Sequence, residues 1–134
     1  MKKVSLFLVA LTVLLSGCHI SEGLAEGDKA VAKFHQQFNN EEFGEIYEQS
    51  GIEFRGVHNK EELIENFRDI RKEFGKFESI MHQGWAVNKD SFGIVTKINL
   101  KTQFEKGVGK ERFIFLVNGN DVKLTSYEFE ADSK

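Results

Sequence analysis

The spacing of apolar residues changes at Gly75, and this change constrains the fold more than any other feature of the chain. Before Gly75, apolar side chains recur at helical intervals, as in Leu63, Phe67, Ile70 and Phe74. After Gly75, apolar and polar side chains alternate, most clearly along residues 92–104, which is the period of a half-buried strand. A chain that is helical first and extended afterwards predicts an α+β fold, with helices on one face of an antiparallel sheet.

The helical half of the chain predicts three helices. The first covers residues 28–39, with Val31, Phe34 and Phe38 on one face, and Leu24 extends this face if the helix starts earlier. A second, shorter helix follows Asn40, whose side chain can cap it. Residues 52–56 are expected to be extended or looped, because Ser50-Gly51 interrupts the helical pattern. The third helix is expected to begin at Asn59 and to stop at Gly75.

The second half predicts four strands, over residues 77–87, 92–104, 111–117 and 122–129. The third of them is apolar on both faces, which is typical of an interior strand. Phe113, Phe115 and Val117 share one face, whereas Ile114 and Leu116 share the other. Because helices can cover only one face, we expect a homodimer through the sheet. The alternative is a monomer in which Lys97, Lys101 and Trp85 shield this patch.

The N-terminus has the layout of a secretory signal peptide. Lys2 and Lys3 precede an apolar run over residues 4–15, which is too short to span a bilayer comfortably. Leu15-Ser16-Gly17-Cys18 follows and resembles the lipobox of bacterial lipoproteins, in which the cysteine is acylated and becomes the mature N-terminus. The resemblance implies a signal peptide over residues 1–17 and lipid on Cys18.

The same resemblance predicts how the mature protein is placed. Residues 18–27 would be the acylated cysteine and a polar tether, and residues 28–134 the domain. The chain would be exported and held at a membrane by its lipid. Because His19 is not aspartate, the resemblance implies the periplasmic side of the outer membrane if the source has two membranes.

The charge balance argues against two classes of partner, nucleic acid and, by electrostatic attraction, anionic lipid. Without Lys2 and Lys3, the chain carries 16 basic and 21 acidic side chains, a formal charge of −5. Nucleic-acid binding needs a clustered basic face, so it is not expected. Cys18 is the single cysteine, so an internal disulfide is excluded.

The order of elements resembles the NTF2-like (cystatin-like) superfamily over roughly residues 28–130. The Phe-rich first helix, the short helix at residues 43–47 and the final strand at residues 123–129 carry the resemblance. It implies three helices packed on a curved four-stranded sheet that forms a cone, as in small bacterial lipoproteins of that fold. The superfamily contains isomerases, dehydratases, polyketide cyclases and non-catalytic binding modules, so the fold does not choose among them.

The residues offer little recognisable chemistry. The four histidines have no metal-ligand spacing, so neither a metal nor another cofactor is expected. We expect His35 and His82 to be surface or half-buried histidines. No catalytic residue is assigned. Side chains that would reach the mouth of the cone and bind a ligand are Tyr47, Arg55, Trp85 and Tyr127.

Two leading functions are compatible with this sequence, beside a third option, a self-assembling structural subunit that an interface on the sheet would support. The first is an envelope-anchored, non-catalytic binding module for a small apolar ligand, a peptide or a protein partner. The second is an NTF2-like isomerase or hydrolyase with an acid or base in the cone. A convergent set of carboxylate, histidine and tyrosine with a shifted pKa would favour the enzyme. A filled, charge-free cone with an exposed apolar sheet face would favour the binding module.

Overall fold

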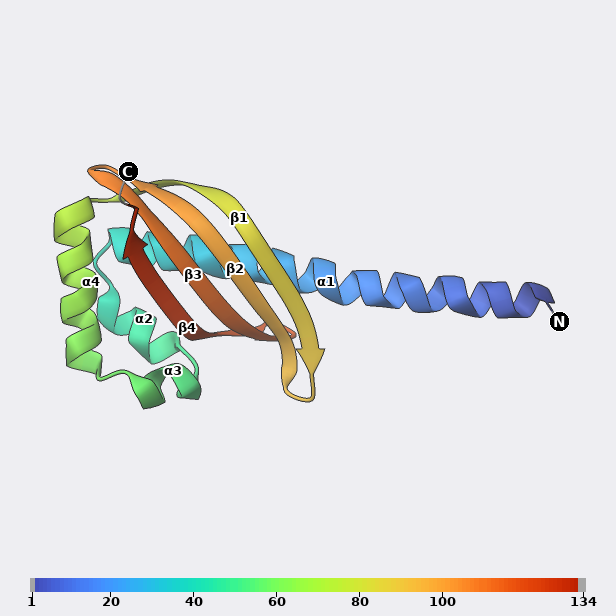
Figure 1. Cartoon of the computed structure of the whole chain (residues 1–134). Helices are drawn as coiled ribbons and strands as arrows, with labels where there is room; N and C mark the ends of the chain where they lie inside the picture. Colours follow the sequence, from blue (N-terminus) through green and yellow to red (C-terminus); the bar gives the residue numbers. More distant parts are fainter. Residues whose placement is uncertain (1, 133–134) are drawn as a thin grey trace.

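The structure, a computed structural model, describes residues 2–132, with side chains from Cys18 onward. Within these residues, four helices precede an antiparallel sheet of four strands in chain order, and the expected α+β class is confirmed. The sheet is curved and does not close into a barrel (Figure 1). The elements are α1 (Lys2–Asn39), α2 (Phe43–Gln49), α3 (Ile52–Val57), α4 (Lys60–Phe74), β1 (Phe77–Asp90), β2 (Gly93–Phe104), β3 (Gly107–Asn118) and β4 (Asp121–Ala131).

Helix α1 continues through the residues expected to form an extended tether, so that expectation is wrong. Gly23 and Gly27 are four residues apart, lie on one face of the helix and are buried. A Cβ atom at Gly23 would lie 2.8 Å from Thr96 Oγ1, and one at Gly27 would lie 2.9 Å from Ile98 Cδ1. Glycine at these two positions lets the helix backbone approach β2 closely. The side chains of the expected signal peptide, residues 1–17, lie outside the described part of the structure.

The other helices follow the sequence in part. Helix α4 is capped as expected, because the Asn59 side chain accepts hydrogen bonds from the backbone N–H groups of Glu61 and Glu62. Gly75 ends it with a φ of 79°, in the left-handed region that favours glycine. Glu42 rather than Asn40 precedes α2. The loop expected at residues 52–56 is the short helix α3, which buries Phe54 completely.

Phenylalanine rings fill the interior between α1 and the sheet. The Phe34 ring lies edge-on to Phe113 of β3 at 5.0 Å and to Phe67 of α4 at 5.7 Å between centroids. The apolar stripe of this helix predicts that Phe67 is buried against the sheet face of Ile94, Ile98 and Leu100. Phe67 is buried, but its ring neighbours belong to α1, α2 and β4. Helix α4 therefore packs across α1 and α2, while Ile70 is only half-buried.

The two faces of β3 differ in burial. Phe113, Phe115 and Val117 are buried toward the helices, whereas Ile114 and Leu116 are half-buried on the opposite face. The homodimer through this face stays a prediction. Among the described residues, the large apolar side chains that are well exposed lie elsewhere, at Ile52, Val57, Ile80, Met81, Trp85 and Phe92.

We predict that Phe67→Ala lowers the free energy of unfolding by about 3–5 kcal/mol, because it leaves a cavity among well-packed rings. The neighbouring exposed residue supplies the control, since Asn66→Ala should change this free energy by less than about 0.5 kcal/mol. Denaturant unfolding of both variants measures the difference. Equal, small effects of the two substitutions would contradict the packing of α4.

Candidate functional site

Four polar side chains from four elements meet inside the phenylalanine core. Glu111 comes from β3, Thr102 from β2, Tyr127 from β4 and His35 from α1. Glu111, Thr102 and His35 are 3%, 0% and 2% exposed. Thr102 and Tyr127 are diagonal neighbours of Glu111 across the two strand pairs, because Glu111 itself pairs with Leu100 and Phe129. We call these four residues the Glu111 cluster.

The Glu111 carboxylate is the centre of the cluster. Its Oε1 accepts a hydrogen bond from the Thr102 hydroxyl at 2.6 Å and lies 2.7 Å from His35 Nε2. Its Oε2 accepts a hydrogen bond from the Tyr127 hydroxyl at 2.5 Å. Taking a carboxylate out of water is costly unless partners replace the lost hydration. Three partners on two oxygens supply that replacement here.

Tyr127 acts as a hydrogen-bond donor in this cluster. Burial, together with the charge of Glu111 and the hydrogen bond to it, raises the pKa of Tyr127 well above its ordinary value of 10.0. The phenol therefore stays protonated at neutral pH. It stabilises the carboxylate and cannot serve as a base.

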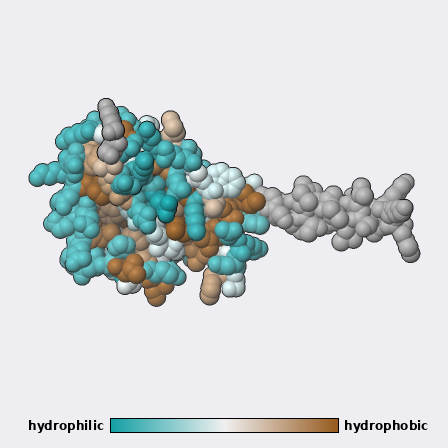
Figure 2. All heavy atoms as spheres, in the orientation of Figure 1, coloured by the Kyte–Doolittle hydropathy of each residue, from teal (hydrophilic) through white to brown (hydrophobic). Residues whose placement is uncertain are grey.

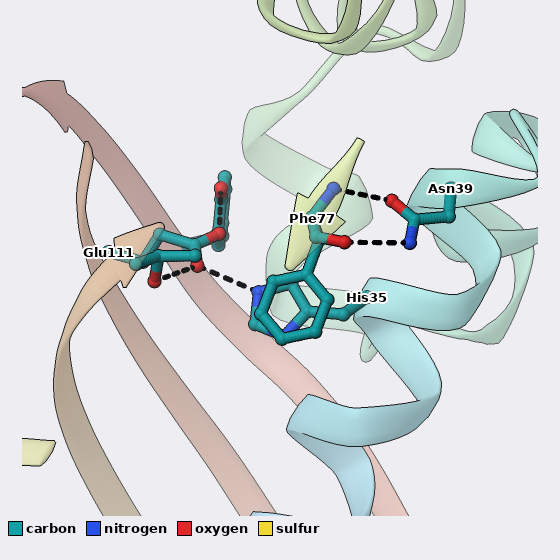
Figure 3. Close-up of polar contacts among 6 residues, drawn as sticks. His35, Asn39, Phe77 and Glu111 are labelled. Carbon is teal, nitrogen blue, oxygen red and sulfur yellow. Dashed lines mark hydrogen bonds and ion pairs between the residues drawn. The ribbon is translucent and has the colours of Figure 1, made fainter. Parts of the chain in front are cut away.

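His35 uses one ring nitrogen and leaves the other without a partner. Its ring stacks on Phe77, with centroids 3.9 Å apart and planes within 2° of parallel (Figure 3). Nδ1 is buried and has no hydrogen-bond partner. Because Nε2 is paired with the carboxylate, any further hydrogen bond of this ring has to be made by Nδ1. This atom is the one unsatisfied polar group within the Glu111 cluster.

An open groove of about 400 Å³ lies beside His35, between α1 and the edge strand β1. We call it the α1–β1 groove. Val31, Phe77 and Ile80 give it apolar walls, and Asp28 lies at one end. At the other end, the Asn39 amide donates to the Phe77 carbonyl at 3.2 Å and accepts from the Phe77 N–H at 2.7 Å (Figure 3). The Asn39 side chain thereby pairs with the Phe77 N–H and C=O groups, as the backbone of a neighbouring strand would.

A larger hollow of about 610 Å³ is also open to solvent, but its chemistry differs. Its lining includes Glu111 together with the polar side chains of Asn99, Arg112 and Glu128, and Arg112 contacts the other two of these three. Arg112 Nε donates to Asn99 Oδ1 at 3.2 Å, and its Nη1 lies 3.8 Å from Glu128 Oε2. These exposed polar side chains therefore already have hydrogen-bond or ion-pair partners in the absence of a ligand. The α1–β1 groove is the better candidate site, because His35, whose buried Nδ1 has no partner, is among the residues that line it.

The structure separates the four expected ligand-binding residues. Tyr47 and Arg55 are neighbours at α2 and α3, where the Tyr47 hydroxyl donates to the Arg55 carbonyl at 3.4 Å. Trp85 lies on β1 and is 55% exposed. Tyr127 is turned into the core, toward Glu111. They do not line one common mouth, and only Tyr127 belongs to the cluster described above.

Sequence reasoning placed His35 at or near the surface, and this was wrong. It also missed Glu111 and Thr102. The signal for Glu111 was available, since it shares the inward parity of Phe113, Phe115 and Val117 on an apolar strand. A charged side chain at such a position requires buried partners. No sequence pattern paired it with a histidine 76 residues away.

Comparison with models of known protein families and with curated proteins finds no match to this chain. In the part of the chain that the structure describes, no three metal-ligating side chains come together. Among the same residues, no helix has both the length and the apolar character needed to cross a membrane.

We predict that the folded protein loses stability as the pH rises above 10, through Tyr127. The pKa of this group is raised in the folded state, so above pH 10 the unfolded chain releases a proton that the folded chain keeps. In a Tyr47→Phe background, Tyr127 is the remaining tyrosine. Tyrosinate absorption should be absent from the native protein about one unit above pH 10 and appear on unfolding. Native titration near pH 10 would contradict the buried hydrogen bond.

Proposed function

We propose that this chain is an exported lipoprotein, anchored through acylated Cys18, whose domain is a non-catalytic binding module of NTF2-like architecture. The lipobox-like residues 15–18 support the anchor, and Cys18 is exposed. A long first helix packed on a curved antiparallel sheet supports the architecture (Figure 1). The ligand of the module occupies the α1–β1 groove.

One observation carries the binding role, namely the unpartnered His35 Nδ1 beside the apolar walls of the α1–β1 groove. Ligand pockets combine apolar walls with a few polar groups that orient the ligand. This groove suits a small ligand or a peptide side chain with an apolar body and one polar group. A small movement of the His35 ring would bring Nδ1 within hydrogen-bond distance of that group.

The Glu111 cluster supports a structural role more than a catalytic one. A general base must lie within hydrogen-bond reach of the proton that it removes. Both oxygens of Glu111 are already engaged, and the rings of Phe34 and Phe113 fill the neighbouring interior. A substrate placed next to this carboxylate would have to displace the core.

The same cluster supports a second candidate, an isomerase or hydrolyase of the NTF2-like type. A carboxylate that holds one imidazole nitrogen can orient the other nitrogen as a general base. His35 and Glu111 have this relationship, at 2.7 Å. The enzyme requires His35 Nδ1 to face the groove when substrate is bound. Chemical conversion of a groove ligand by the wild type, but not by His35→Gln, would favour the enzyme over the binding module.

We predict that native mass spectrometry of the mature protein in detergent, purified from the envelope, shows a retained small molecule. Ala32 lines the groove and is exposed, so Ala32→Trp should fill the groove and remove the bound mass. Ala25→Trp is the matched control, because Ala25 is an exposed residue of α1 outside the groove. A wild type without bound mass, or equal retention by both variants, would reject the groove as the binding site.

We predict that Cys18→Ser abolishes membrane association, because the acyl chains on the thiol are the anchor. Fractionation of cells that express wild type and variant measures this, with the uncleaved precursor resolved by its larger mass. Ser21→Ala, a change at an exposed α1 position near Cys18, is the control and should leave the fractionation unchanged. Unaltered membrane association of processed Cys18→Ser would refute the anchor.

A further inference from the structure

The turn between β1 and β2 lies at the end of the domain from which α1 leaves (Figure 1). A Cβ atom at Gly27 would contact Ile98, whereas one at Gly23 would contact Ile94 and Val87, which are nearer the turn. Helix α1 therefore runs toward this turn as it runs toward the N-terminus. Cys18 is five residues before Gly23, about 7.5 Å farther along the helix, and it is exposed. The expected site of the lipid is thus roughly level with residues 89–93.

The geometry of this turn projects an aromatic side chain into solvent. The Asp90 side chain accepts hydrogen bonds from the N–H groups of Phe92, at 2.8 Å, and Gly93, at 3.1 Å. Gly93 has a φ of 142°, and a Cβ atom there would lie 2.6 Å from the Val117 carbonyl oxygen, so the position requires glycine. Phe92 is 74% exposed as a result. The sequence pattern had placed it on the buried face of the strand.

The residues around Phe92 are compatible with a lipid surface. Lys89 is exposed beside it, and the Asp90 carboxylate is turned into the hydrogen bonds of the turn. The other turn at this end, between β3 and β4, is polar, and its Asp121 lies 3.6 Å from Lys123. Aromatic and basic side chains are the pair typical of the membrane–water interface. On the face that Figure 2 shows, hydrophobic atoms gather near the point where α1 leaves the domain.

We infer that residues 89–93 form a second membrane contact, in which Phe92 enters the interfacial region and Lys89 contacts lipid phosphate. This inference rests on the lipid anchor proposed above. Two attachments hold an orientation that a single flexible one does not. The α1–β1 groove begins at Asp28, ten residues from Cys18 and about 15 Å farther along α1. The inferred orientation therefore keeps the groove clear of the bilayer and open to the envelope space.

The test uses the mature, acylated protein in vesicles of phosphatidylcholine and phosphatidylglycerol that contain brominated lipid. Trp85 is the single tryptophan, so Trp85→Phe supplies a background without tryptophan. Phe92→Trp then places a probe at the β1–β2 turn. Lys106→Trp is the matched control at the exposed β2–β3 turn, roughly 40 Å away along the twelve residues of β2. We expect bromine quenching and a blue shift of emission for Phe92→Trp and neither for Lys106→Trp.

The possible outcomes separate this inference from the proposed function. If the proteins float with the vesicles but neither probe is quenched, the anchor stands and the contact of residues 89–93 is overturned. Equal quenching of both probes overturns the fixed orientation. If the acylated protein does not float, the anchor itself fails, and the inference fails with it. As a second measurement, hydrogen exchange at residues 89–93 of the wild type should become slower when the protein is bound to vesicles. Phe92→Asp should leave flotation and folding intact but remove this slowing. Slowing equal to that of the wild type would also overturn the contact.

Discussion

The buried carboxylate of Glu111 is the interaction on which the arrangement of the elements depends. Its partners come from α1, β2 and β4, so one side chain ties the first helix to three strands. A change in the position of α1 relative to the sheet would remove His35 from the carboxylate and leave a charge with too few partners, at a cost of several kcal/mol.

Close packing of α1 on β2 allows His35 of α1 to reach the Glu111 carboxylate. Gly23 and Gly27 let the helix backbone come near Thr96 and Ile98, since any side chain on these glycines would clash with β2. The phenylalanine rings then occupy the remaining space up to α4. The rings of Phe34 and Phe113 fill the interior on the helix side of Glu111, and this residue also lines the larger solvent-open hollow. The proposed ligand would occupy the α1–β1 groove at the sheet edge, where Asn39 rather than a fifth strand pairs with Phe77.

Helix α1 connects the two parts of the proposed function, the lipid anchor and the ligand-binding groove. Its N-terminal part leads to Cys18 and the expected lipid, and its C-terminal part forms one wall of the groove. Continuous helix between these points is stiffer than the extended tether that the sequence suggested. In the proposed anchoring, this rigid connection would fix the orientation of the domain on the membrane and place the exposed Phe92 at the level of the lipid surface.

Much of the fold follows from periodicity, because a helix or strand that is buried on one face has apolar residues at regular intervals in its sequence. The change of period at Gly75, the Asn59 cap and the alternation along β2 each predicted the element that the structure contains. Predictions from local residue preferences, such as glycine for loops, were less reliable where tertiary contacts decide the conformation. Residues 52–56 form a helix that buries Phe54, and the glycines at positions 23 and 27 support close packing instead of flexibility.

The candidate site could be predicted from the sequence only in part. Alternation could mark Glu111 as inward-facing, but its partner His35 is 76 residues away, and no local pattern links the two. The sequence by itself determined the α+β class, the order of the strands and the apolar faces, since these depend on spacing between near neighbours. Only the tertiary structure decided that His35, Thr102 and Tyr127 surround one carboxylate and that a groove opens between α1 and β1. Both depend on how the packed elements meet in space.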